Sequence, residues 1–159
     1  MGLVDGKVCL VTGGASNPGL GHAIAHKLAS EGATVIVTDV DGDGAVTALG
    51  DGLMIIRKLF GPAFSGDKLT DKAISPGATR TTEEIHNFIQ DGINAGGLDV
   101  DQDGHTTALG DGLMVIRHLF GAAFAGAALT SKALSPDSPY AADERPWESV
   151  AGNIDGLYF

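Results

Sequence analysis

The sequence predicts a mixed fold, in which a short strand–helix–strand unit precedes a mainly α-helical pair of loop–helix units. Residues 39–76 repeat without gaps as residues 99–136, and each copy joins an Asp-rich loop to an apolar stretch with near-helical spacing. Before the repeat, a glycine-rich turn separates two short apolar runs. We therefore divide the chain into an N-terminal segment (1–38), a tandem repeat (39–136) and a tail or linker (137–159).

In the N-terminal segment, residues 7–12 and 34–38 are predicted to be strands, with a helix at 20–31 between them. The turn TGGASNPGLG would let backbone N–H groups approach a pyrophosphate at the start of that helix. This stretch resembles the opening of the short-chain dehydrogenase/reductase family, whose fold is Rossmann-like. The resemblance implies a nicotinamide cofactor, NAD(P), held by Gly13, Gly19 and Gly21.

The catalytic pair of that family is not matched. The family uses a Tyr followed four residues later by a Lys, which exchange a proton with the reacting oxygen. In this chain Glu144 stands four residues after Tyr140, and Tyr158 is followed by one residue only. We therefore predict no enzymatic activity, and the alternative interpretation is a truncated reductase remnant that binds a nucleotide at most.

Each repeat begins with acids at loop positions 1, 3 and 5 and a glycine at position 6. Alternating carboxylates on a tightly wound loop supply oxygen ligands for Ca²⁺, position 7 supplies a backbone carbonyl, and position 9 binds directly or through water. The sequence thus predicts two calcium ions rather than a pair of solvated turns. The predicted ligands are Asp39, Asp41, Asp43, Ala45, Thr47 and Asp51 in the first loop, and Asp99, Asp101, Asp103, His105, Thr107 and Asp111 in the second.

The end of each loop departs from the usual pattern. Position 12, which normally carries a bidentate acid, is Gly50 or Gly110, and the acid follows one place later as Asp51 or Asp111. Both copies share this shift, so we interpret it as a loop expanded by one residue. If the displaced acid does not reach back, calcium affinity should fall below that of a regulatory sensor.

The apolar residues after each loop predict one buried helix per repeat, and the two helices are expected to pack together. Between the copies, residues 81–85 (TTEEI) predict a capped helix start, for a helix that packs on the repeat or alternatively binds a partner. The tail at 137–159 is expected to be a linker, or to lay its aromatic side chains on the repeat helices.

Two Asp-rich loops, each followed by one apolar helix with no entering helix, resemble a tandem type I dockerin repeat, an EF-hand-like module. The resemblance covers residues 39–136. It implies calcium-dependent docking onto a protein partner of the cohesin kind, in extracellular or cell-surface assemblies that often act in polysaccharide catabolism. In that family the partner contacts include loop positions 10 and 11, which here are Ala48 and Leu49, and Ala108 and Leu109.

The net charge of the sequence indicates which classes of partner the chain is not expected to bind. The formal net charge of −10 opposes binding to nucleic acid or to an anionic membrane. The sequence also shows no signal peptide and no run of about 20 apolar residues.

Residues 39–41 fit both patterns, as the end of the reductase-like segment and as the start of the first calcium loop. We therefore hypothesise that the chain is a fusion at this tripeptide. Asp39 would bind either a ribose or a calcium ion.

Overall fold

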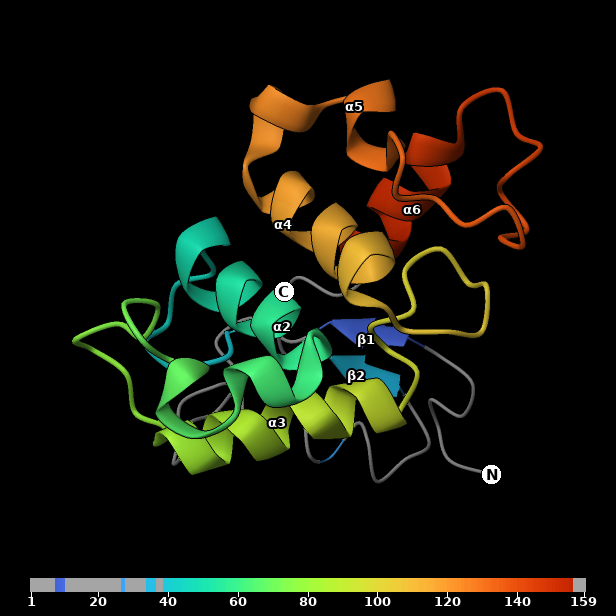
Figure 1. Cartoon of the computed structure of the whole chain (residues 1–159). Helices are drawn as coiled ribbons and strands as arrows, with labels where there is room; N and C mark the ends of the chain where they lie inside the picture. Colours follow the sequence, from blue (N-terminus) through green and yellow to red (C-terminus); the bar gives the residue numbers. More distant parts are fainter. Residues whose placement is uncertain (1–7, 11–26, 28–33, 37–38, 156–159) are drawn as a thin grey trace.

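The structure is a computed structural model that describes residues 8–10, 27, 34–36 and 39–155. Helices dominate the described part of the chain (Figure 1). Its helices are α2 (Leu53–Leu59), α3 (Thr82–Asn94), α4 (Leu113–Leu119), α5 (Ala127–Thr130) and α6 (Pro146–Asp155), with π-helical turns at Ala48–Gly52 and Ala108–Gly112 and 3-10 turns at Gly61–Phe64, Gly66–Lys68 and Gly121–Phe124.

The predicted mixed fold with a Rossmann-like βαβ unit is wrong: the described fold is mainly α-helical. Two strands are described, β1 (Val8–Leu10) and β2 (Thr34–Ile36), which pair in parallel. Each has only three residues, and a parallel pair this small cannot form the covered sheet of a Rossmann-like unit. The helix predicted at 20–31 lies outside the described residues, apart from Lys27.

The two repeats form equivalent loop–helix units that pack face to face. Each π-helical turn leads directly into a seven-residue helix, α2 in the first unit and α4 in the second. Each turn also contacts the helix of the other unit. A glycine sits at each contact, so the backbones approach closely: a Cβ on Gly52 would lie 2.9 Å from Leu119 Cδ1, and one on Gly112 would lie 3.0 Å from Leu59 Cδ1.

A further helix covers each unit. In Figure 1, α3 runs beneath α2, while α6 lies beside α4 and α5. Helix α3 buries Ile85 and Ile89, and α6 buries Val150 and Ile154, all in one core with the repeat residues Met54, Ile55, Met114 and Val115. From the tail, Tyr140 and Trp147 pack against this core.

The predicted cap before α3 is present. Thr81 Oγ1 accepts a hydrogen bond from Glu84 N, and Glu84 Oε2 accepts one from Thr81 N. This reciprocal pair satisfies two amide donors that the first turn of a helix leaves open. None of the described helices is long and apolar enough to cross a membrane.

Candidate metal centre

The acids at positions 1, 3 and 5 converge in each loop. Asp39, Asp41 and Asp43 each offer one carboxylate oxygen within a span of 4.8 Å, and so do Asp99, Asp101 and Asp103. Within the described part of the chain, these are the two groups of acids, His or Cys that could hold a metal ion. Oxygen ligands this close together repel one another as anions, which makes the site attractive to a cation.

Backbone amides of the same loop fix these carboxylates. Asp39 Oδ1 accepts from Gly42 N at 2.7 Å, and its Oδ2 accepts from Gly44 N at 2.8 Å. In the second loop, Asp99 Oδ2 accepts from Gly104 N at 2.9 Å. Gly44 and Gly104 have φ angles of 89° and 88°, a left-handed conformation that favours glycine, so the predicted sharp turn is observed at position 6.

The displaced acid reaches back into its loop. In the π-helical turn, Gly52 N donates to Thr47 O, and this wider winding accommodates one extra residue before α2. As a result, Asp51 Oδ1 accepts from Val40 N at 2.7 Å and Oδ2 accepts from Thr47 N at 2.8 Å. Asp51 thus ties the loop's beginning to its end, although it lies outside the cluster of three carboxylates.

The second loop has the same arrangement. Asp111 Oδ1 accepts from Val100 N, and Oδ2 accepts from Thr107 N, both at 2.8 Å. Both displaced acids are 2% exposed. Burial raises the pKa of Asp51 to about 6 and raises the pKa of Asp111 as well, against the lowering effect of these amide bonds.

Asp101 provides the observation that tests whether a cation fits. It is 2% exposed, and its Oδ2 accepts from Ser135 N at 2.8 Å. Its Oδ1 is buried and has no hydrogen-bond partner among the described residues. A buried, unsatisfied carboxylate oxygen is costly unless a cation or donor meets it, so the residues present fit a bound cation.

The remaining predicted ligands lie on the same loops. Ala45 N donates to Asp43 Oδ1, and His105 N donates to Asp103 Oδ1. The Thr47 and Thr107 hydroxyls accept from Gly50 N and Gly110 N, so both side chains cap their π-helical turns. The predicted nucleotide-binding residues Gly13, Gly19 and Gly21 lie outside the described residues.

Sequence reasoning did not identify two groups that complete the loops. The amides of Ser75 and Ser135, 34 residues beyond the acid, donate to the Oδ2 atoms of Asp41 and Asp101. The signal was present, since a Ser-Pro pair ends both copies of the repeat. The other group is Arg80, whose Nη1 donates to Asp39 O and to Val40 O at 3.1 Å.

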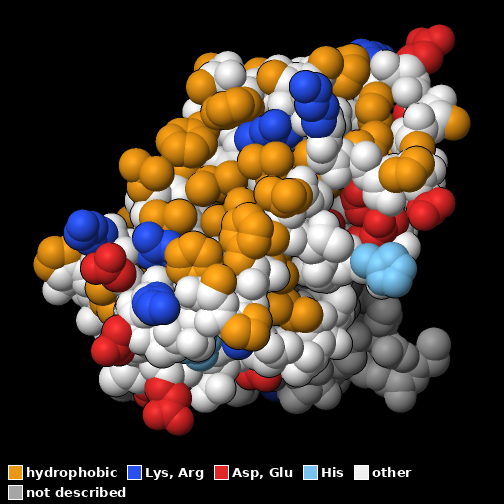
Figure 2. Space-filling model, in the orientation of Figure 1, with side chains coloured by type: hydrophobic (Ala, Val, Ile, Leu, Met, Phe, Trp, Pro, Cys, Tyr) orange, Lys and Arg blue, Asp and Glu red, His pale blue; other side chains and the backbone are white. Residues whose placement is uncertain are grey.

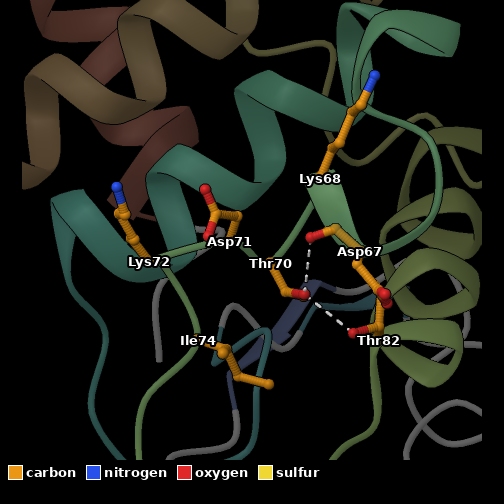
Figure 3. Close-up of a pocket in the computed structure, with 7 residues that line it drawn as sticks. All are labelled: Asp67, Lys68, Thr70, Asp71, Lys72, Ile74 and Thr82. Atoms are coloured by element: carbon orange, nitrogen blue, oxygen red, sulfur yellow. Dashed lines mark hydrogen bonds between the residues drawn. The ribbon is translucent and has the colours of Figure 1, made fainter.

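A separate pocket lies between the segment 67–74 and the start of α3 (Figure 3). Thr70 Oγ1 points toward Thr82 Oγ1 at 2.9 Å, while the Lys68 and Lys72 side chains extend away from that pair. None of the predicted calcium ligands lines this pocket.

One face of the molecule carries an apolar region over its helices (Figure 2). In Figure 2, apolar side chains gather over the helices at the centre of the view, and acidic ones cluster at the right, where Figure 1 places the loop that leads into α4. Matching positions of the repeat are exposed: Leu49 and Leu109 are 63% and 64% exposed, and Phe60 and Phe120 are 45% and 42% exposed.

Part of the chain is similar to short-chain dehydrogenases/reductases. The 3-oxoacyl-[acyl-carrier-protein] reductase FabG of Aquifex aeolicus is 38% identical over 94 residues, which cover 57% of this chain and 34% of that protein. The short-chain type dehydrogenase/reductase y4mP of Sinorhizobium fredii is 43% identical over 49 residues, 31% of this chain and 19% of that protein.

Sex determination protein tasselseed-2 of Zea mays is 42% identical over 57 residues, 34% of this chain and 16% of that protein. The chain therefore spans about a third or less of the length of these relatives. No protein-family model and no solved structure matches the chain. The predicted resemblance to the reductases is confirmed over part of the chain, whereas the dockerin resemblance stays a prediction.

Proposed function

We propose that residues 39–136 form a calcium-binding module that takes one Ca²⁺ in each Asp-rich loop. The observation that carries this proposal is the buried Oδ1 of Asp101, which has no hydrogen-bond partner among the described residues and lies in a cluster of three carboxylates. In each loop the acids at positions 1, 3 and 5 would hold the ion, with the carbonyl of Ala45 or His105 and the Thr and Asp at the end of the loop as further oxygen donors.

The chemistry of these donors favours calcium. All are oxygens, and a loop that mixes carboxylates with backbone carbonyls matches the flexible six- to eight-oxygen shell that Ca²⁺ accepts. When bound, the ion would neutralise the clustered acids. Asp51 and Asp111 would link the ion site to α2 and α4 through the π-helical turns. Binding should therefore stabilise the helices together with the loops.

A calcium titration tests the module directly. We expect Ca²⁺, added to the chelator-treated protein, to raise the melting temperature measured by circular dichroism and to give two binding events by calorimetry. The double variant D43N/D103N is the matched control, because it removes the charge of one acid per loop, at a residue that accepts from the amide two residues further on. An unchanged melting temperature at millimolar Ca²⁺ would rule out the proposed function.

The exposed apolar residues support a second part of the proposal, docking to a protein partner of the cohesin kind in an extracellular assembly. Leu49 and Leu109 occupy loop position 11 and are more than half exposed, although residues of this type are usually buried. A type I cohesin module is the probe. We expect the cohesin module to bind in the presence of Ca²⁺, to dissociate in chelator and to bind the L49D/L109D variant more weakly. Equal binding with and without chelator would contradict the proposed docking.

Similarity to the reductases supports an alternative function, a reductase remnant that binds NAD(P) through residues 1–38. In that case a nicotinamide nucleotide, rather than Ca²⁺, should raise the melting temperature. The variant G13A/G19A would abolish that shift while leaving any response to Ca²⁺ intact. The two functions are therefore distinguishable in one set of thermal melts.

A further inference from the structure

The first loop has a charged neighbour, Arg80. Its guanidinium donates to the carbonyls of Asp39 and Val40, at the first two positions of the first loop. Its Cζ lies 4.2 Å from the centroid of the Phe88 ring on α3, which holds the side chain in place. The carboxylates of Asp39 and Asp41 attract it, followed by those of Glu84 and Asp51.

Neutral groups take the corresponding place in the second loop. Tyr140 stands where the repeat would put a second arginine, 60 residues after Arg80. The carbonyl of Val100 accepts instead from Asn153 Nδ2 of α6 at 2.8 Å, and Asn153 Nδ2 also donates to the Tyr140 hydroxyl at 3.1 Å. The second loop thus has a similar hydrogen bond at this carbonyl but without a positive charge.

The carboxylates at position 3 also differ between the two loops. Asp41 has both oxygens bonded, Oδ1 to Asp43 N at 3.1 Å and Oδ2 to Ser75 N at 2.7 Å. The matching Asp101 keeps its buried Oδ1 without a partner among the described residues. Without an ion, the carboxylate at position 3 is therefore better satisfied in the first loop than in the second.

We propose that Arg80 makes the two calcium sites unequal, so that the second loop takes the first ion and the first loop fills later and more weakly. This inference rests on the proposed calcium-binding function. Arg80 acts as a resident cation of the first loop: it partly neutralises the acids that would bind the ion and repels a divalent cation. The second loop has the same four acids, at positions 1, 3, 5 and 13, and among the described residues its Val100 carbonyl is met by the neutral amide of Asn153 instead of a guanidinium. A charge at this range changes the binding constant about tenfold.

Single-loop variants assign the two affinities. D43N impairs the first loop and should leave one tight calcium-binding event, at the second loop. D103N impairs the second loop and should leave one calcium-binding event, at the first loop, that is about tenfold weaker. Calorimetry measures both in the full chain. Adding R80Q to D103N should then strengthen the remaining site about tenfold, because glutamine keeps a hydrogen-bond donor and removes the charge. The backbone bonds from Thr79 N and Arg80 N to Asp41 O remain available in the variant.

Further variants separate charge from structure. R80K keeps the charge and should leave the weak affinity unchanged, while R80M, which retains an apolar stem over Phe88, should behave like R80Q. R145Q is the charge-matched control, since Arg145 lies in an exposed ion pair with Glu148. Circular dichroism in chelator shows whether each variant is folded.

Three outcomes overturn the inference. The first is that D43N and D103N bind calcium with equal affinity. The second is that neither R80Q nor R80M strengthens calcium binding at the first loop. The third is that R145Q strengthens this binding as much as R80Q does. Absence of calcium binding in the unmodified chain would instead overturn the proposed function itself. The failure of one can therefore be told from the failure of the other.

Discussion

At the scale of single residues, burial disfavours the ionised form of the acids at the loop ends. Asp51 is 2% exposed, and burial raises its pKa from the ordinary 3.8 to about 6. A raised pKa in the folded chain means that the protonated carboxyl is the better tolerated form. In the calcium-free protein this group therefore stabilises the fold at low pH, and that contribution is lost as the pH rises from about 4 through 6.

Calcium binding is expected to be linked to proton release near pH 6. The ion requires ionised carboxylates, so binding should displace the proton of Asp51, and affinity of the first loop should fall about tenfold per pH unit below pH 6. Calorimetry at pH 5 and pH 7.5, in buffers of different ionisation enthalpy, measures both effects. In D51N the proton linkage of the first loop should disappear. The same affinity at both pH values would contradict the prediction.

At the scale of elements, the π-helical turns direct the displaced acids back toward their loops. An ordinary α-helical start would rotate Asp51 and Asp111 away from the loop by one residue. The wider i to i+5 bonds, Gly52 N to Thr47 O and Gly112 N to Thr107 O, turn the acids back toward it. The extra residue is therefore tolerated in both copies.

The caps of these turns give a testable prediction. Thr107 Oγ1 accepts from Gly110 N at 3.1 Å, so T107A should lower the free energy of unfolding by about 1 kcal/mol, the usual cost of losing an N-cap. Urea unfolding in excess chelator removes any contribution of Thr107 to ion binding. T107S keeps the hydroxyl and serves as the control. A loss of the same size in T107S would show that the hydrogen bond is not the cause.

At the scale of the whole molecule, the repeat places two glycines where the loop–helix units meet. A Cβ on Gly112 would lie 3.0 Å from Leu59 Cδ1 and 3.1 Å from Ile56 Cγ1. Both positions have ordinary helical φ and ψ angles, so the constraint comes from packing and not from the backbone. The same closeness recurs at Gly52 against Ile116 and Leu119.

G112A is expected to destabilise the protein, because a methyl group there forces the two units apart. Overpacking of this kind typically costs about 1–3 kcal/mol. G92A is the matched control. Gly92 lies within α3, and a Cβ there would lie 3.8 Å from Leu98 Cδ1 and Cγ, which is ordinary van der Waals contact. Alanine should therefore stabilise that helix by about 0.5–1 kcal/mol. Thermal or urea unfolding measures both. Opposite signs are expected, and a stabilising G112A would argue against the close packing of the units.

Much of the candidate site could be predicted from local sequence. The acids at positions 1, 3 and 5, the glycine at position 6 and the Thr81 cap all act over a few residues, so their spacing predicts the geometry that is observed. The N-terminal segment shows the limit of the same reasoning. Its apolar runs and glycine motif predicted a Rossmann-like unit, but two strands of three residues do not form one.

The sequence by itself determined the duplication, the two acidic loops and the helices that follow them, because hydrophobic periodicity and loop spacing are local properties. Only the tertiary structure decided which distant groups complete each loop. Arg80 lies 40 residues from Val40, and Asn153 lies 53 residues from Val100. Their contacts depend on how the helices pack, which no local pattern records. For that reason two loops of nearly identical sequence have different electrostatic surroundings.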